Sequence, residues 1–309
     1  MRFLSLFKPE YIYQPRQVLR RIRLTSRRIA EDECVVDLPW GLSLVVNPHE
    51  LIGNCVARLG VYDLTVSEAL WRLLDPGDTA VDIGSNIGYT ASILARRSGP
   101  NGRVYCFEPH PDIFRRLERN ISQWRLPVIA RNVAVSSEEG TAELRVPRYF
   151  PGNQGTASLA MAPSGAAQGI TVQCATLDAM ADIKGPISVL KVDVEGHEPA
   201  VFRGAMQRLA RGEIRDIVFE DHGVYPTPAM KLLTAQGYRL YLLRHRFRGP
   251  FLATPEGAKD RGDPPNYLAT RDPQRAERRF AQSGWQLLTR SRTQSQSIPG
   301  KAGNSERHA

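Results

Sequence analysis

Two short segments carry most of the side chains that could do chemistry. They are "VLKVDVEGHE" (189–198) and "IVFEDH" (217–222), and each crowds acids and histidines directly after a run of apolar residues. The members of this set are Asp193, Glu195, His197, Glu198, Glu220, Asp221 and His222. Carboxylates and imidazoles accept protons, so the set suits an enzyme that removes a proton from its substrate.

A third segment, "VDIGSNIGYTA" (81–91), is typical of a ligand-binding turn between a strand and a helix. Asp82 stands near the end of the apolar run, Gly84 permits a tight turn, and Gly88 permits close packing of the next helix. The N–H groups at such a helix start can hold a carboxylate. Asn86 stands where the dinucleotide fingerprint GxGxxG requires its second glycine, which disfavours NAD and FAD. The segment therefore favours a cofactor with an amino-acid part.

One more acid ends the next apolar run. Glu108, in "YCFEP" (105–109), follows Asp82 by 26 residues. A carboxylate at a strand end can accept one hydroxyl proton of a ribose on each of its oxygens. A glycine turn followed by such an acid predicts a cofactor that contains a nucleoside.

The elements that position these residues follow from hydrophobic periodicity. Short apolar runs alternate with stretches of helical period, which predicts an α/β fold with a doubly wound, mainly parallel sheet covered on both faces. We expect strands at 79–83, 102–109, 127–136, 186–196 and 216–221, with 238–245 and 266–271 closing the sheet as a hairpin. Ligands of such a fold bind at the carboxyl ends of the strands, so the three segments are expected to meet there.

The chain divides into four parts. We expect a basic arm at 1–30, an extension with a hairpin and a helix at 31–75, a catalytic domain at 76–272, and a polar, disordered tail at 273–309. Residues 150–169 are rich in Gly, Ala, Ser and Pro, and we expect them to form a mobile loop that closes over the substrate.

Charge narrows the choice of partners. The net charge is +9, yet residues 1–28 hold eight basic side chains and one acid, residues 271–309 hold eight and three, and the body between them is −3. A nucleic-acid enzyme more often carries a basic stripe across its working face, so no nucleic-acid partner is expected. The arginine-rich start is expected to be a solvated basic helix or a frayed arm, with peripheral contact to an anionic membrane as the alternative.

Three further features of the sequence bear on the cellular compartment of the protein. The sequence has no apolar run of the roughly 20 residues that a membrane-spanning helix needs. It shows no signal peptide, and its four cysteines have no CxxC spacing. These features predict a cytoplasmic protein with free thiols.

Taken in order, six segments resemble the FkbM-type family of S-adenosylmethionine (SAM) methyltransferases. They are "VDIGSNIG", "FEPHP", "NVAVSSEEG", "TLDAM", "VLKVDVEGHEPAVFRGA" and "IVFEDH". The resemblance covers about 75–225, with weaker support to 245, and Ser85 departs from the alanine that is common in the family. It implies a class I methyltransferase with a seven-stranded sheet, SAM as the cofactor, and transfer to a hydroxyl oxygen of a small molecule or a sugar.

The resemblance also implies which residues hold SAM. Those expected at its methionine end are Asp82, Gly84, Ser85, Asn86 and Gly88. Glu108 is expected to bind the ribose hydroxyls, and Asn132 and Val133 are expected beside the adenine.

Methyl transfer to oxygen requires alignment of the two reactants and removal of the hydroxyl proton. We expect Asp193 to position the hydroxyl or take its proton, with His222 and Glu195 as supporting or alternative groups. His197 and Glu198 are expected to act locally at the start of the next helix, and Glu220 is left between orienting a loop and taking part. A metal site would use Asp193, Glu195, Glu220 and His222; because no compact ligand motif enforces it, we predict no metal.

Two other functions stay open. A nicotinamide-dependent oxidoreductase on a Rossmann sheet is opposed by Asn86 and by the segment "DVEGHE". A domain that keeps the fold but only binds is opposed by the acid-rich edge. Calorimetry with SAM and with NAD distinguishes the oxidoreductase from a methyltransferase. Turnover of SAM distinguishes a domain that only binds from an enzyme.

Overall fold

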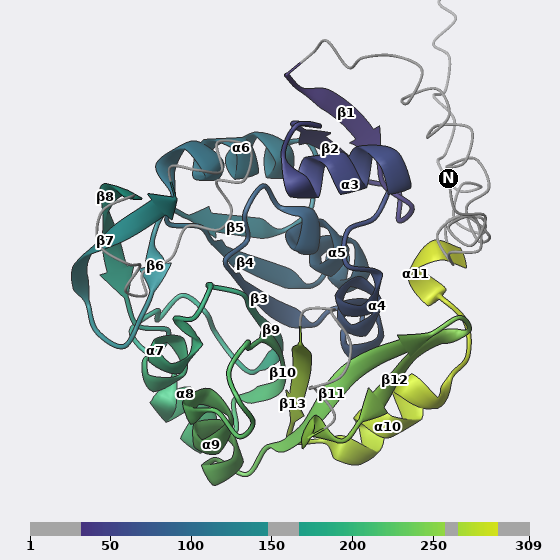
Figure 1. The fold of residues 1–309 in the computed structure, drawn as a ribbon, viewed down its shortest axis with the longest axis vertical. Helices are drawn as coiled ribbons and strands as arrows, with labels where there is room; N and C mark the ends of the chain where they lie inside the picture. The colour runs from purple at the N-terminus through teal and green to yellow at the C-terminus, as the bar shows by residue number, and fades with distance from the viewer. Residues whose placement is uncertain (1–31, 148–166, 257–264, 290–309) are drawn as a thin grey trace, which may run out of the picture.

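The computed structural model describes residues 32–147, 167–256 and 265–289 (Figure 1). The expected basic arm with its membrane contact, most of the expected loop at 150–169, and the last part of the expected tail lie outside these ranges. Among the described helices, none combines the length and the apolar character that crossing a membrane would require.

An eight-stranded sheet forms the centre of the molecule, in the order β12-β11-β13-β10-β9-β3-β4-β5. Its parallel strands are β3 (Thr79–Ile83), β4 (Arg103–Phe107), β5 (Val128–Arg131), β9 (Ile187–Val192) and β10 (Ile214–Glu220). The chain moves outward from β3 in one direction and from β9 in the other, so the strand order reverses between these two neighbours. The expected doubly wound sheet is confirmed, and ligands of such sheets bind at this reversal.

The far edge of the sheet differs from the expectation of seven strands. β13 (Asn266–Thr270) pairs antiparallel with both β10 and β11 (Arg239–Arg246), and β12 (Gly249–Ala253) adds an outer strand. The expected pairing of 238–245 with 266–271 is confirmed, but β12 lies between them in the chain, so they do not form a simple hairpin. The sequence "GPFLA" gives a weak strand signal because proline is tolerated only at sheet edges, which is where β12 lies.

Helices cover both faces of the sheet, as Figure 1 shows. Side chains of α4 (Leu64–Leu73) and α5 (Tyr89–Ser98) share one hydrophobic core with α6 (Pro111–Ser122). The other face is covered by α7 (Glu198–Arg203), α8 (Met206–Ala210) and α9 (Pro228–Ala235). Every residue of β9 is buried because helices cover it on both sides.

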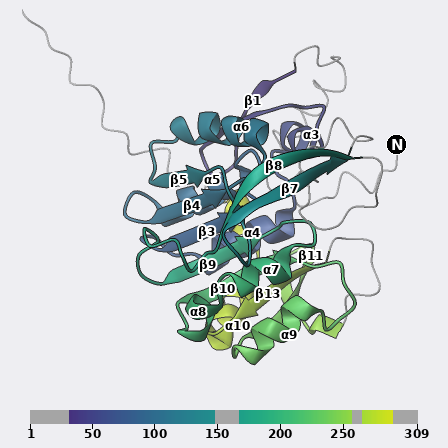
Figure 2. The same cartoon turned by 90° about the vertical axis from the view of Figure 1, so that its left-hand side faces the viewer.

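Two smaller sheets flank the centre. β1 (Cys34–Asp37) and β2 (Ser43–Val46) form the expected N-terminal hairpin, which is followed by α3 (Leu51–Leu59), a helix that the sequence pattern did not predict. β6 (Ala134–Val135), β8 (Ala167–Ala175) and β7 (Gly140–Pro147) form the other sheet, on the side that faces the viewer in Figure 2. The expected strand at 127–136 is therefore two strands, because β6 leaves the central sheet and pairs with β8.

The folded part of the chain extends further toward the C-terminus than predicted. A polar tail is expected from residue 273, but α10 (Pro273–Ala281) and α11 (Gln286–Thr289) pack on the described domain. The cause is a buried ion pair on α4: Arg72 donates to Glu68 at 2.8 Å and to the carbonyl of Gly284 at 2.6 Å. Glu68 also accepts hydrogen bonds from the first two backbone N–H groups of α11. These contacts satisfy buried charges and anchor residues 273–289.

Candidate active site

The glycine turn after β3 lies against the end of β9. Gly84 has φ +76°, and a Cβ placed on it would lie 1.9 Å from the carbonyl oxygen of Asp193. The backbone N–H of Asp193 in turn donates to the carbonyl of Ile83 at 3.1 Å. Asn86 also has positive φ, 49°, a conformation that asparagine tolerates better than most residues. The predicted tight turn at Gly84 is confirmed, and it brings the loop to the acidic end of β9.

Glu108 binds the same turn from β4. Its carboxylate accepts hydrogen bonds from the N–H of Asn86 at 2.9 Å and from the N–H of His110 at 3.0 Å. Burial raises the pKa of Glu108 to about 7, against the lowering effect of these two N–H groups. Each oxygen accepts one N–H and keeps a lone pair for a further donor. The predicted strand-end acid therefore lies beside the turn.

The residues expected beside the adenine border a separate cavity. Asn132 donates to the carbonyls of Glu108 and Pro109, both at 2.8 Å, and so joins the ends of β4 and β5. Asn132 and Val133 line a cavity of about 360 Å³ together with Arg131. This cavity lies next to the carboxyl end of β4, at the side of the turn away from β9.

Two of the expected cofactor residues lie beneath the turn. The Asp82 side chain is fully buried and accepts a hydrogen bond from Thr90 at 2.6 Å. The Ser85 hydroxyl donates to the carbonyl of Asp82 at 2.7 Å and accepts from the N–H of Phe107 at 3.2 Å. Both side chains therefore support the shape of the turn from below.

Gly88 begins α5 with φ +95°. A Cβ on Gly88 would lie 2.9 Å from the side chain of Leu117 on α6. The expectation that this glycine permits close helix packing is confirmed. The backbone N–H of Gly88 donates to the carbonyl of Ser85, which closes the turn.

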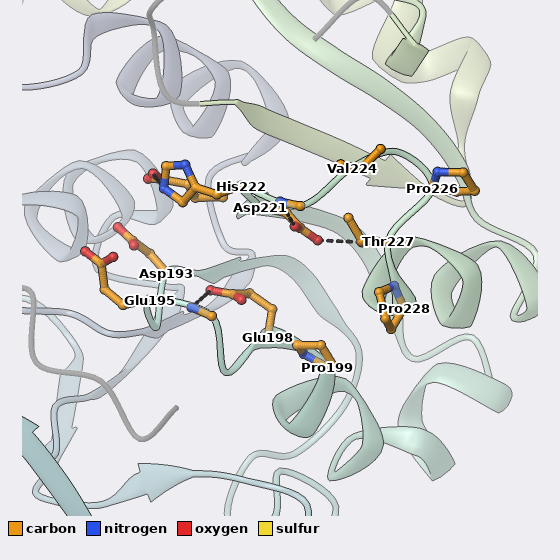
Figure 3. Close-up of a pocket in the computed structure, with 13 residues that line it drawn as sticks. Asp193, Glu195, Glu198, Pro199, Asp221, His222, Val224, Pro226, Thr227 and Pro228 are labelled. Carbon is orange, nitrogen blue, oxygen red and sulfur yellow. Dashed lines mark hydrogen bonds and ion pairs between the residues drawn. The ribbon is translucent and has the colours of Figure 1, made fainter. Parts of the chain in front are cut away.

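An acidic pocket of about 250 Å³ opens at the ends of β9 and β10 (Figure 3). Its lining comes from the loops that lead into α7 and α9, and the three predicted catalytic residues all belong to it. The acidic pocket is lined by Asp193, Glu195, Gly196, Glu198, Pro199, Glu220, Asp221, His222, Gly223, Val224, Pro226, Thr227 and Pro228. Five carboxylates and one imidazole therefore line a single pocket.

Glu220 and His222 form a close pair in this pocket. Glu220 Oε1 lies 2.6 Å from His222 Nε2, and the imidazole is largely exposed while the carboxylate is mostly covered. Burial, with Asp193 as the next cause, raises the pKa of Glu220 to about 7, although His222 opposes the shift. Glu220 is therefore in direct contact with His222, one of the predicted catalytic residues.

Glu195 stands beside Asp193 in the acidic pocket, with a backbone φ of 51°. Burial and the charge of Asp193 raise its pKa, and the imidazole of His222 opposes that shift. The structure thus brings Asp193, Glu195 and His222 together, as the two sequence segments predict. Within the described residues, no group of three or more His, Cys, Asp or Glu side chains is arranged to hold a metal ion.

The neighbouring His197 and Glu198 have local structural contacts. His197 Nε2 lies 2.9 Å from the hydroxyl of Ser136, and burial lowers the pKa of this histidine. Glu198 accepts hydrogen bonds from the N–H groups of Val194 and Gly196, at 3.3 and 3.2 Å. Both observations agree with the expectation that these residues act at the start of α7.

Sequence reasoning missed Lys191, whose ammonium group lies between the turn and the acidic pocket. It donates to the carbonyl of Gly84 at 2.9 Å and lies 3.4 Å from Asp82 and 3.5 Å from Asp193. Burial lowers the pKa of Lys191, but the two carboxylates outweigh burial and the net direction is upward. A lysine inside the apolar run "ISVLKV" is the signal that could have identified it.

A second group that sequence reasoning missed lines an inner pocket, which shares Asp193 and Glu220 with the acidic pocket. It contains Tyr62 and Asp63, just before α4, and Asn266 at the start of β13. Asp63 caps α4 by accepting from the N–H of Val66 at 3.0 Å, and its other oxygen accepts from Asn266 at 3.1 Å. An acid before a helix predicts a cap, but its place beside the site depends on contacts that are remote in sequence.

Comparison with known proteins gives a family match over half of the chain. Residues 82–240 match the model of the methyltransferase FkbM domain. The chain is similar to the hexuronic acid methyltransferase AglP of Haloferax volcanii, with 32% identity over 182 residues, which are 56% of this chain and 70% of that protein. It is also similar to the AMB antimetabolite synthetase AmbE of Pseudomonas aeruginosa, with 30% identity over 142 residues, 44% of this chain but 6% of that protein.

Solved structures resemble the chain more loosely. A SAM-dependent O-methyltransferase from Thermotoga maritima overlays with a TM-score of 0.40 and 15% identity, over 68% of this chain and 65% of that one. Aeropyrum pernix fibrillarin, solved with natively bound SAM, overlays with a TM-score of 0.39 and 17% identity, over 79% and 96% of the two chains. Overlays this weak carry no argument, so the fold class rests on the strand order and on the matched domain.

Proposed function

Because this chain belongs to the FkbM methyltransferase family, we propose that it transfers a methyl group from SAM to a hydroxyl of a sugar bound in the acidic pocket. Methyl transfer follows from the family, whereas the binding residues, the acceptor and the proton path are proposals. The matched family also removes the support for a nicotinamide-dependent oxidoreductase.

The residues at the reversal of the strand order fit SAM. The turn 84–88 lies directly against the end of β9, since any Cβ on Gly84 would collide with the carbonyl of Asp193. Glu108 keeps lone pairs for the ribose hydroxyls, and the cavity beside Asn132 and Val133 is next to it for the adenine. When bound there, the cofactor supplies a methyl group that a nucleophilic oxygen can accept.

The acidic pocket fits a polyhydroxylated acceptor. Carboxylates accept hydrogen bonds from hydroxyls, and five of them line this pocket. The similarity to a hexuronic acid methyltransferase supports a sugar. A sugar carboxylate would be repelled by the acids, so the hydroxyl face of the sugar enters the pocket and any acidic group stays outside it.

The side chains of the acidic pocket divide the remaining work. Asp193 accepts a hydrogen bond from a neighbouring hydroxyl of the sugar and so orients the reacting oxygen. His222, whose Nε2 is engaged by Glu220, takes the hydroxyl proton on Nδ1, and the carboxylate of Glu220 stabilises the resulting imidazolium. Glu195 adds negative charge beside Asp193. This paired arrangement also argues against a domain that only binds.

The observation that carries the proposal is the contact of the cofactor turn with Asp193, because it brings donor and acceptor sites to one point. The test is turnover of SAM with a panel of sugars and sugar acids, read by product mass. We expect one sugar of the panel to give a product that is about 14 mass units heavier, because methylation of a hydroxyl adds one CH₂. Cleavage of SAM without a methylated sugar would contradict the proposal.

A further inference from the structure

Lys191 is a charged residue inside a strand whose other members are all apolar or small and buried. Its side chain is 6% exposed, and its ammonium group lies among three oxygens: the carbonyl of Gly84, one carboxylate oxygen of Asp82 and one of Asp193. The carbonyl accepts a hydrogen bond at 2.9 Å, and the two carboxylates are ion-pair partners at 3.4 and 3.5 Å.

Charge compensation of Asp82 explains only part of this arrangement. The Asp82 carboxylate is fully buried, so it needs a cation, and its second oxygen already accepts from Thr90. The Asp193 side chain, by contrast, is 40% exposed and lines the acidic pocket, so folding does not demand a cation for it. The contact of Lys191 with Asp193 and with Gly84 therefore serves something other than burial.

We propose that Lys191 is a positioning residue for methyl transfer, which holds the cofactor turn through Gly84 and the acceptor-binding carboxylate of Asp193 in one fixed relation. The inference rests on the proposed function, because it assumes that Asp193 receives the acceptor hydroxyl. Lys191 touches neither substrate in this account and acts through the two groups that do.

Electrostatics support the same conclusion. Glu195 and Glu220 both lie close enough to Asp193 for its charge to raise their pKa. Three carboxylates in one pocket repel one another, and the ammonium group of Lys191 offsets this repulsion at Asp193. Without that cation, the Asp193 carboxylate loses its ion-pair partner at 3.5 Å and is free to rotate.

The test must separate positioning from folding. Lys191→Met alone would leave the buried charge of Asp82 without a partner, and loss of the fold would then be uninformative. The informative pair is Asp82→Asn and the double variant Asp82→Asn/Lys191→Met, which both lack the Asp82 charge and differ only at Lys191. Lys184→Met is the matched control. Lys184 is exposed and precedes the amino end of β9, whereas the site lies at its carboxyl end.

At saturating SAM, we expect the double variant to have a kcat roughly 10- to 100-fold below that of Asp82→Asn, the usual size of a lost charged hydrogen bond. Lys184→Met should leave kcat unchanged. When Asp193→Asn is added to both members of the pair, their kcat values should become equal, because Lys191 then has no carboxylate to position.

Equal kcat values in the original pair would overturn the proposal. Binding of S-adenosylhomocysteine, measured by calorimetry, tests the contact with Gly84 without any acceptor. We expect the double variant to bind about tenfold more weakly than Asp82→Asn, and equal affinity would contradict the inference. Failure of the wild-type chain to methylate any sugar would defeat the proposed function, while the calorimetry would still decide the part played by Lys191.

Discussion

The carbonyl oxygen of Asp193 occupies the space in which a side chain on Gly84 would begin. A Cβ on Gly84 would lie 1.9 Å from that oxygen, so these two residues touch backbone to backbone. Gly84 belongs to the turn proposed to bind the donor, and Asp193 lines the pocket proposed to bind the acceptor. In the proposed function, this contact sets the distance between the two substrates.

The first prediction concerns this contact. Gly84→Ala should abolish binding of S-adenosylhomocysteine and lower the melting temperature, because the turn cannot move away from the end of β9. Gly77→Ala is the matched control: Gly77 has φ +88°, but a Cβ there meets nothing within 4 Å. The free energy of unfolding of the control should fall by only about 1 kcal/mol, which is the cost of placing alanine in a left-handed backbone conformation. Equal effects of the two substitutions on affinity would show that the contact is unimportant.

The second prediction concerns Glu108, whose pKa is raised to about 7 by burial. Ribose hydroxyls donate to the ionised carboxylate, so affinity for S-adenosylhomocysteine should rise between pH 6 and 8 in the wild-type chain. Glu108→Gln should weaken binding roughly tenfold or more at pH 8 and remove this pH dependence. The exposed Glu138→Gln is the control, and calorimetry at several pH values is the measurement. An affinity that varies equally with pH in Glu108→Gln would exclude the ribose contact.

The same group makes a prediction about stability. The folded pKa of Glu108, about 7, lies above its ordinary value of 4.5, so the folded chain keeps a proton that the unfolded chain releases between these values. Its contribution to stability is therefore full below about pH 4.5 and is lost as the pH rises through 7. Urea unfolding at pH 5 and pH 8 should show a smaller difference for Glu108→Gln than for the wild-type chain. An unchanged difference would contradict burial as the cause of the shift.

The third site of prediction is the pair of Glu220 and His222. His222→Ala should lower kcat roughly 100-fold or more, as expected for loss of a general base, and leave the affinity for SAM unchanged. Glu220→Gln should lower kcat less and flatten its rise through pH 7, since the pKa of Glu220 is about 7. The exposed His49→Ala is the control. A fully active His222→Ala would remove this imidazole from the proton path.

A fifth prediction separates binding from turnover at Asp193. Asp193→Asn should bind S-adenosylhomocysteine with nearly wild-type affinity but lose kcat by about 100-fold, because an amide orients a hydroxyl less well than a carboxylate does. Single-turnover kinetics with a methylated product as readout is the measurement. Retention of full activity would mean that another group orients the acceptor.

The sequence predicted much of this site because its residues follow local signals. Strand ends mark Asp82, Glu108 and Asp193, and positive φ marks Gly84 and Asn86; each is determined by neighbours a few positions away. The doubly wound sheet follows from the alternation of apolar and amphipathic segments for the same reason. Residue types and short spacings were therefore enough to predict that the three segments meet at the carboxyl ends of the parallel strands.

What could not be predicted depends on contacts between distant segments. Asp63 reaches Asn266 across 203 positions, and Glu68 holds α11 across 218, and no periodicity encodes such pairs. In the sequence, Lys191 is an unexplained charge inside a buried strand. Its role becomes apparent only from its contacts with Asp82, Gly84 and Asp193 in the structure. The outer strand β12 and the ordered segment 273–289 were missed because packing, rather than local propensity, stabilises them.

The most direct test of the central claim is a crystal structure with S-adenosylhomocysteine. The account predicts that the cofactor product lies across the turn 84–88, with its ribose hydroxyls on Glu108, its adenine beside Asn132 and Val133, and its sulfur toward Asp193 and the acidic pocket. A product bound with its sulfur away from the acidic pocket, or with its ribose out of reach of Glu108, would contradict it.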